Sequence, residues 1–306
     1  MRITILGSAA GGGFPQWNCN CANCAGVRAS TCRAKPRTQS SIFIRPDTSA
    51  DGVLVNASPD ILEQIRSHPA LQPARAPRDT AIAGVLLMDG QVDHATGLYM
   101  LRERGSPLPV WCTDPVDADL RTGNPIFSLL QHYCGVDRRA VPLDGSSFEV
   151  SGVPGLSFKA LPLASKPAPY SPHRDNPVVG DNIGITVTDR TGGGTLFYAP
   201  GLGAMAPATF DAMASADVVL VDGTFWTDDE MIRQGFSQKR GRDMGHLPQS
   251  GPGGMIEWLA KLPARTRRAL IHINNTNPIL VEDSPERGEL DRAGIEVCED
   301  GMEISL

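Results

Sequence analysis

The sequence predicts an α/β fold, because short apolar runs typical of buried strands alternate with segments whose apolar residues recur at helical spacing. The best-defined case is residues 84–101, where an apolar run bounded by glycines switches to helical spacing through Leu98, Met100 and Leu101. Polar donor side chains gather where this run ends, and open α/β sheets usually carry their chemistry at that end of their strands. The 306 residues, 41% of them hydrophobic, suffice for one large domain or two small ones.

Apolar patterning and turn residues place the other elements. Strands are expected at residues 2–6, 40–45, 53–56, 109–112, 148–150, 180–187, 195–201, 217–224 and 268–272. Helices are expected at residues 61–68, 127–133, 206–214 and 254–262. The first three strands form a meander, and the proline-rich segment 161–174 interrupts regular structure because proline lacks the backbone N–H.

Charge and composition exclude several classes of function. The formal net charge is −6 and no basic run occurs, which argues against a nucleic-acid surface. No apolar segment approaches the roughly 20 residues needed to span a bilayer, and the amino terminus runs into a glycine-rich turn without a signal-peptide core. That turn, residues 7–13, lacks the Lys and Ser/Thr of a phosphate-binding loop. We therefore expect a cytoplasmic protein that acts on a small molecule or a peptide.

Four donor side chains crowd the turn after the apolar run: Asp89, Gln91, Asp93 and His94 lie within six residues. Carboxylate, amide and imidazole groups this close could share one metal ion. The alternative is an ordinary helix start, in which Asp93 accepts backbone N–H groups and His94 is a satisfied polar residue.

Cys19, Cys21 and Cys24 form a second cluster, with three thiols in six residues. Thiolates at C-x-C-x-x-C spacing can converge on one tetrahedral Zn²⁺ whose fourth ligand comes from elsewhere. A redox pair or free thiols are the alternatives, and a structural disulfide is disfavoured in the cytosol. The spacing therefore predicts a structural zinc site.

The proline-rich segment carries three side chains suited to a substrate: Tyr170, His173 and Arg174. The Arg174 guanidinium could hold a carboxylate through two parallel hydrogen bonds. An exposed loop with no ligand is the alternative, and the residues themselves leave both open.

The turn at 89–94 resembles the H-x-H-x-D-H signature of the metallo-β-lactamase superfamily, with Asp89 and Gln91 in place of the first two histidines. In that superfamily the first two histidines serve one metal position and the Asp-His pair serves the other. The resemblance therefore implies a single metal held by Asp93 and His94, with Asp89 and Gln91 as possible further ligands.

Three later residues match the same superfamily. Asp222, at the end of a buried apolar run, matches its bridging aspartate, although a turn-capping role is the alternative. His272 matches its last metal histidine. His246 follows a glycine where phosphodiesterase relatives bring a histidine into the active site. The resemblance gives His246 a catalytic role beside Asp93 and His94.

Further motifs narrow the resemblance. Residues 7–19, the degenerate turn at 89–94, residues 198–201 and residues 272–278 are together similar to the pyrroloquinoline quinone (PQQ) biosynthesis protein B family, along residues 1–306. This resemblance implies one αββα sandwich domain and a structural zinc that supports a homodimer. It also implies a role in making PQQ from a Glu- and Tyr-containing peptide. Asn275 stands where close relatives with the cysteine cluster place a zinc-binding histidine, which leaves the fourth zinc ligand open, and His272 could serve the zinc instead.

The resemblance leaves two activities open. One is an oxygenase that uses Fe(II) and O₂ to hydroxylate the tyrosine of the Glu-Tyr precursor. The other is a carrier that helps move PQQ or an intermediate towards the periplasm. Asp93, His94, Asp222 and His272 come close to the donor set of mononuclear non-haem Fe(II) oxygenases, so we favour the oxygenase. A hydrolase ranks third, because it needs a water activated on a metal held by more nitrogen donors.

Overall fold

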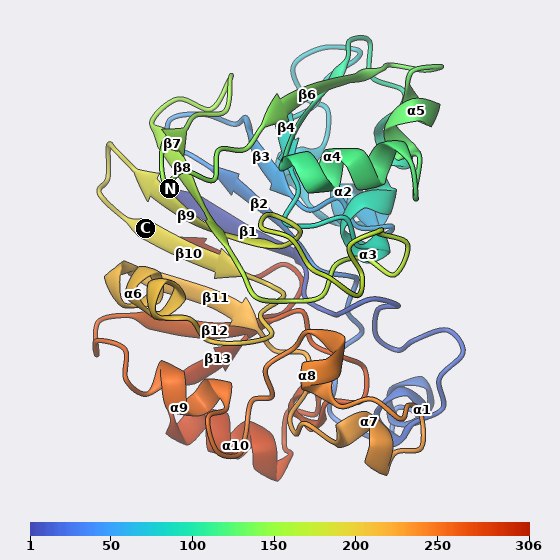
Figure 1. Cartoon of the computed structure of the whole chain (residues 1–306), viewed down its shortest axis with the longest axis vertical. Coiled ribbons are helices and arrows are strands. Elements are labelled where there is room, and N and C mark those ends of the chain that lie inside the picture. Colours follow the sequence, from blue (N-terminus) through green and yellow to red (C-terminus); the bar gives the residue numbers. More distant parts are fainter.

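Two seven-stranded sheets pack face to face in the computed structural model, which describes residues 1–306 (Figure 1). In order across the first sheet, the strands are β14 (Glu303–Ser305), β1 (Arg2–Gly7), β2 (Ser41–Arg45), β3 (Gly52–Val55), β4 (Ile82–Leu86), β5 (Leu108–Cys112) and β6 (Val136–Ala140). Across the second they are β13 (Ile295–Val297), β12 (Arg267–Ile271), β11 (Val218–Asp222), β10 (Thr195–Ala199), β9 (Ile183–Asp189), β8 (Leu156–Pro162) and β7 (Ser147–Phe148).

Each sheet is antiparallel in one part and parallel in the other. Strands β1, β2 and β3 form the expected meander, and β3 to β6 then run parallel. In the second sheet β7 to β10 are antiparallel, whereas β10 to β13 are parallel. Parallel neighbours need long crossover connections, which here carry the helices. The carboxyl ends of the parallel strands therefore gather several long loops at one edge of the sandwich.

Helices cover the outer face of each sheet (Figure 1). The first sheet carries α2 (Ile61–Ser67), α3 (Val92–Ala95), α4 (Asp114–Arg121) and α5 (Ile126–Leu130). The second carries α6 (Pro207–Ser215), α9 (Met255–Leu259) and α10 (Pro285–Arg292). Helices α1 (Ala22–Ala29), α7 (Glu230–Arg233) and α8 (Gly241–Met244) lie together near one end of the sandwich, and 3₁₀ turns occur at Pro69–Leu71, Thr96–Leu101 and Pro278–Leu280. No helix is long and apolar enough to cross a membrane.

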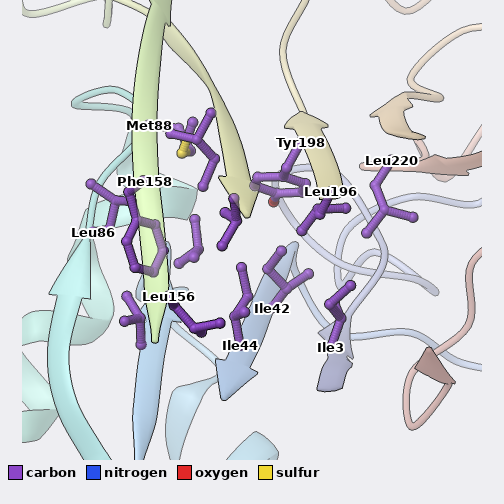
Figure 2. Close-up of a cluster of buried hydrophobic side chains, with 14 of the residues drawn as sticks. Ile3, Ile42, Ile44, Leu86, Met88, Leu156, Phe158, Leu196, Tyr198 and Leu220 are labelled. Carbon is purple, nitrogen blue, oxygen red and sulfur yellow. The ribbon is translucent and has the colours of Figure 1, made fainter. Parts of the chain in front are cut away.

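The main core lies between the two sheets (Figure 2). Ile42 and Ile44 point into it from β2, and Phe158 and Leu196 point into it from the opposite sheet. Full burial of such a side chain contributes roughly 1.5–3 kcal/mol, so this layer dominates the packing. Two further apolar clusters lie between each sheet and its helices. The order of layers is αββα, as expected.

Several elements differ from the expectation. The helix after β4 is only the short α3, followed by a 3₁₀ turn, and β8 runs two residues into the proline-rich segment. Strand β6 was not expected: its sequence, VDRRA, is charged because it is an edge strand with partly exposed side chains. Periodicity also missed α1 and α10, and in α10 only Leu290 is buried.

Candidate metal centre

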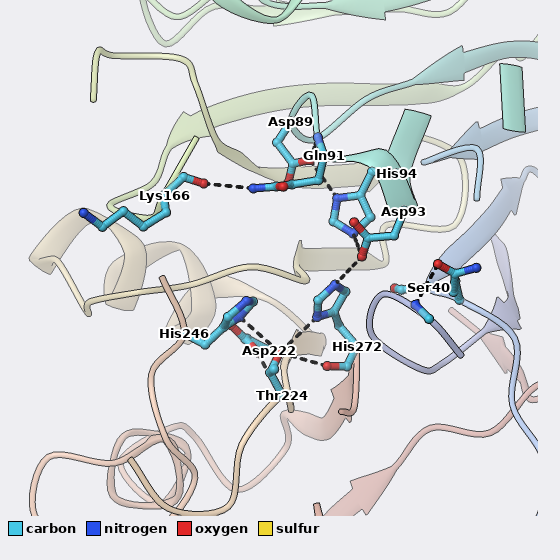
Figure 3. A network of polar contacts seen from close by, with 12 residues as sticks. Ser40, Asp89, Gln91, Asp93, His94, Lys166, Asp222, Thr224, His246 and His272 are labelled. Carbon is cyan, nitrogen blue, oxygen red and sulfur yellow. Dashed lines mark hydrogen bonds and ion pairs between the residues drawn. The ribbon is translucent and has the colours of Figure 1, made fainter. Parts of the chain in front are cut away.

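Side chains from loops far apart in the sequence meet at the carboxyl ends of β4, β11 and β12 (Figure 3). Asp93 and His94 lie at the start of α3, just beyond β4. Asp222 is the last residue of β11, and His272 directly follows β12. His246 follows the glycine that ends α8. Parallel strands end at the same edge of a sheet, so their terminal residues are brought together by the fold itself.

Asp93, His94 and His272 form the first group, with their ligand atoms within 4.8 Å of one another. The Asp93 Oδ2 lies 3.2 Å from His272 Nε2 and 3.7 Å from His94 Nε2. His94 is buried, and its Nε2 has no hydrogen-bond partner. A buried imidazole nitrogen rarely stays unpaired, because desolvating it without a partner is unfavourable. The arrangement of one carboxylate and two imidazoles therefore fits a bound cation.

Asp222, His246 and His272 form a second group that shares His272 with the first. Asp222 is fully buried, and its Oδ2 lies 2.7 Å from His246 Nδ1 and accepts the Leu202 N–H at 2.9 Å. Its Oδ1 accepts the Thr224 N–H at 2.9 Å and the Thr224 hydroxyl at 2.6 Å. Both oxygens of Asp222 are thus occupied by protein partners.

The Thr224 hydroxyl links the two groups. Besides Asp222, it lies 2.9 Å from His272 Nδ1 and 3.0 Å from His246 Nδ1. A hydroxyl donates one proton, and the carboxylate of Asp222 can only accept, so the Thr224 oxygen is left to accept from an imidazole. Accepting the Nδ1 proton of His272 leaves its Nε2 lone pair facing Asp93 and His94.

The carboxylates and imidazoles of the cluster stabilise one another's charged forms. Burial disfavours a charged imidazole, but the carboxylates of Asp89 and Asp93 outweigh it and raise the pKa of His94 to about 9. Burial similarly opposes the charge on His246, and the adjacent Asp222 carboxylate raises its pKa. Against burial, the His94 imidazole holds the pKa of Asp93 well below its usual range, and His246 lowers that of Asp222. Both carboxylates are therefore ionised at neutral pH, which favours a cation between the imidazoles.

Asp89 belongs to neither group, and Asp89 and Gln91 line the cavity beside the histidines with hydrogen-bond partners of their own. The Asp89 Oδ1 lies 2.8 Å from His94 Nδ1 and also accepts the Gln91 backbone N–H at 2.9 Å. The Gln91 side chain donates to the Lys166 carbonyl at 3.2 Å (Figure 3). Asp89 thus orients a histidine, in the way that carboxylates orient metal-bound histidines in other proteins.

Of the three predicted substrate-binding side chains, only Arg174 lines the cavity beside the histidines. This cavity has a volume of about 290 Å³. The Arg174 guanidinium also donates to the Pro167 carbonyl. Tyr170 and His173 lie outside the cavity wall: the Tyr170 hydroxyl donates to the Gly90 carbonyl, and His173 Nδ1 pairs with Asp181 at 3.1 Å. Their role in substrate binding stays a prediction.

Comparison with known proteins places this site in a family. A model of the Beta-lactamase superfamily domain matches residues 52–273. The Coenzyme PQQ synthesis protein B of Azoarcus sp. (strain BH72) is 63% identical, with 100% of both chains covered. That of Cupriavidus necator (strain ATCC 17699 / DSM 428 / KCTC 22496 / NCIMB 10442 / H16 / Stanier 337) is 62% identical, with 99% of each covered. The chain belongs to the coenzyme PQQ synthesis protein B family.

Solved structures agree with this assignment to the coenzyme PQQ synthesis protein B family. The crystal structure of Zn(2+)-bound PqqB from Methylobacterium extorquens covers 100% of both chains, with a TM-score of 0.91 and 39% identity. A diphosphatase from the PhnP family is only 17% identical but has a TM-score of 0.68 over 100% of this chain, so it shares the fold. The metallo-β-lactamase-like αββα fold is confirmed.

The cysteine cluster of this family member lies apart from the histidines. Cys19, Cys21 and Cys24 place their sulfur atoms within 4.8 Å of one another at the start of α1, and Asn275 lies against all three. His272 does not reach them, since its ring nitrogens face Asp93 and Thr224. Asn275, rather than His272, therefore lies against the three thiols.

The sequence did not single out two residues at the centre. Thr224 contacts Asp222, His246 and His272, and its only signal in the sequence is its place two residues after a strand-terminal aspartate. Lys166 lines the cavity, but its ammonium group extends away from the histidines (Figure 3). Nothing in the sequence of the proline-rich segment distinguished Lys166 as a residue of this site.

Proposed function

We propose that this protein is a mononuclear Fe(II)-dependent oxygenase that hydroxylates the tyrosine ring of a Glu-Tyr peptide precursor during PQQ biosynthesis. The observation that carries the proposal is the convergence of Asp93, His94 and His272, with the buried His94 Nε2 left unpaired. Two histidines and one carboxylate are the donor set of many non-haem Fe(II) oxygenases, which keep positions open for O₂ and substrate. The family name supports a place in PQQ synthesis.

Asp222, expected as a fourth ligand, receives a different role in this proposal. Its two oxygens accept hydrogen bonds from Leu202, Thr224 and His246, so coordination would break contacts in a fully buried site. We assign Asp222 to the positioning of His246 and Thr224. The metal is then held by Asp93, His94 and His272 alone.

Loss of the other metal position supports an oxygenase over a hydrolase. Asp89 accepts a hydrogen bond from His94, and the Gln91 side chain donates one to the Lys166 carbonyl. Ser165, which lines the same cavity, donates to the Gly245 carbonyl at 2.8 Å. A second metal ion, the usual means of clamping both oxygens in a hydrolytic displacement, would find no histidine among these three residues.

The reaction needs O₂ activation, which bound Fe(II) would supply. Overall, a ring C–H becomes C–OH, the second oxygen atom leaves as water, and an external two-electron reductant balances the reaction. His246 lines the cavity, and with its Nδ1 donating to Asp222 its Nε2 is free to exchange a proton with the phenol. The Asp222 carboxylate stabilises the protonated form of that imidazole.

Arg174 is our choice for the substrate carboxylate. It lines the same cavity as His246 and His94, and its bond to Pro167 fixes the guanidinium while leaving other N–H groups available. A Glu-Tyr precursor carries carboxylates that a guanidinium binds through two parallel bonds. Tyr170 and His173 would act by shaping the loop that holds Arg174.

The test is oxygen uptake with anaerobically loaded Fe(II), ascorbate as reductant and a Glu-Tyr peptide. We expect peptide-dependent uptake and a catechol product that carries one oxygen atom from labelled O₂. His94→Ala should lose both iron and turnover, and His246→Ala should keep iron and lose turnover. His132→Ala, in an exposed turn, is the matched control.

Absence of both peptide-dependent uptake and catechol would refute the oxygenase. Saturable binding of PQQ without turnover would then favour the carrier.

We also propose the structural zinc at Cys19, Cys21 and Cys24 and a homodimer, as the family resemblance implies. Sedimentation of protein with and without that zinc tests the dimer.

A further inference from the structure

The cysteine cluster presents three thiols to a single carboxamide. The Asn275 Nδ2 lies 3.1 Å from the Cys19 sulfur, 3.6 Å from that of Cys21 and 3.4 Å from that of Cys24. Cys21, Cys24 and Asn275 are all buried. One amide group in contact with three sulfurs takes the corner that the fourth ligand of a tetrahedral site would fill.

We propose that Asn275 completes the zinc site through its carboxamide oxygen, which makes this a three-cysteine, one-asparagine centre. The inference rests on the zinc site proposed above and deepens it. Without metal, the amide NH₂ donates to the sulfurs, which are weak acceptors. A half-turn of the carboxamide exchanges nitrogen for oxygen at nearly the same position, so the oxygen reaches a metal without backbone movement.

No neighbouring donor competes with Asn275 for this corner. The Asn23 carboxamide donates to the backbone carbonyls of Asn275 and Asn277, at 3.1 and 3.0 Å. Glu230, the nearby buried acid, accepts from Trp226 and Thr276. These contacts leave Asn275 as the only side chain directed at all three thiols.

The donor set predicts a distinctive zinc site. A neutral amide oxygen is a harder donor than imidazole, so we expect weaker zinc binding than in a site with three cysteines and a histidine. Three thiolates and Zn²⁺ carry a net charge of −1, and the Arg28 guanidinium, which donates to the Cys19 carbonyl, lies beside it. That cation partly balances the excess charge.

The segment that carries Asn275 also carries His272, three residues earlier. His272 has a φ of 61°, a left-handed conformation that costs energy for a residue other than glycine. Between them, the Ile273 N–H donates to the Ser8 carbonyl and its own carbonyl accepts the Ala10 N–H, both at 2.9 Å. Coordination of Asn275 would thus fix the far end of a segment whose near end holds a histidine of the metal centre.

Cobalt binding tests the assignment. The variants are made in the full-length His94→Ala protein, so that the histidine centre does not contribute to the spectrum. We expect the parent to show sulfur-to-cobalt charge transfer and the ligand-field bands of a tetrahedral site. Asn275→Ala should keep the charge transfer, change the ligand-field bands, and weaken zinc binding by at least about tenfold in chelator competition. Asn275→His should strengthen zinc binding.

Two controls separate the possible failures. Cys21→Ser should lose much of the charge transfer, whereas Cys32→Ser, a thiol outside the cluster, should not. If Asn275→Ala matches the parent in spectrum and affinity while Cys21→Ser does not, the asparagine assignment is overturned and the zinc site stands. If Cys21→Ser also matches the parent, the zinc site fails and the inference fails with it. Neither result bears on the iron oxygenase.

Discussion

Replacement of Thr224 by valine should weaken metal binding at the centre although no proposed ligand is replaced. Valine keeps the branched shape and removes the hydroxyl. In the native site that hydroxyl lies 2.6 Å from Asp222, 2.9 Å from His272 and 3.0 Å from His246. After the change, the buried Asp222 Oδ1 keeps only the backbone N–H of residue 224, and the Nδ1 atoms of both histidines lose this partner.

The expected magnitude follows from these contacts. A hydrogen bond to a charged group contributes about 1.5–3 kcal/mol, and a buried donor left without a partner costs roughly 1–3 kcal/mol. We therefore expect Thr224→Val to lower the free energy of unfolding by about 3 kcal/mol, because the two contributions overlap. Loss of a hydrogen-bond partner that orients a metal-binding histidine typically weakens metal binding by about 10–100-fold. We expect a loss of this size because Thr224 orients His272.

Urea unfolding and chelator competition for Fe(II) measure the two effects. Thr224→Ser is the control, because it restores the hydroxyl and should recover most of the metal affinity. The spectrum of bound cobalt should also change in the valine variant and return in the serine variant. Unchanged iron affinity in Thr224→Val would refute the idea that this hydroxyl sets the orientation of His272.

Three further predictions concern the cavity, the lost metal position and pH. Arg174→Lys should raise KM for the Glu-Tyr peptide by about tenfold with little change in kcat, since lysine cannot form two parallel bonds to a carboxylate; unchanged kinetics would exclude the clamp. Asp89→His with Gln91→His should raise the metal content per chain by mass spectrometry and lower oxygenase turnover; an unchanged metal content would contradict this. Burial raises the pKa of Glu230 to about 7, from an ordinary value of 4.5. Because the folded state then keeps a proton that the unfolded state has lost, stability should fall by up to roughly 3 kcal/mol as pH rises from 4.5 to 7. Glu230→Gln should remove this part of the pH dependence in urea unfolding, and a slope equal to that of the wild type would refute it.

The sequence could predict several strands and the polar residues that gather at their ends because the two are linked by a simple rule. Asp222 and His272 directly follow apolar runs that are buried on both faces, as parallel strands are. Such runs are easy to recognise, and their carboxyl ends meet at one edge. Asp93 and His94 were found in the same way, after β4.

What the sequence could not predict depends on contacts between distant loops. The role of Thr224 arises from three partners contributed by β11, the loop after α8 and the loop after β12. Whether Tyr170 or Arg174 faces the cavity depends on the path of a proline-rich loop that has no periodicity. Edge strands such as β6 and β14 were missed because one side of each is exposed, which weakens the apolar signal.

The exchange at position 89 shows how one substitution can change the chemistry of a site. A histidine there would be a ligand, whereas Asp89 accepts a hydrogen bond from His94 and so becomes the outer-shell partner of a ligand at the other position. A carboxylate behind an imidazole fixes its tautomer and raises its basicity, which strengthens the remaining metal position. The same change removes a donor from the first position, and Gln91 turns towards the Lys166 carbonyl. In the proposed oxygenase, this exchange would leave a single metal position with room beside it for O₂ and an aromatic substrate.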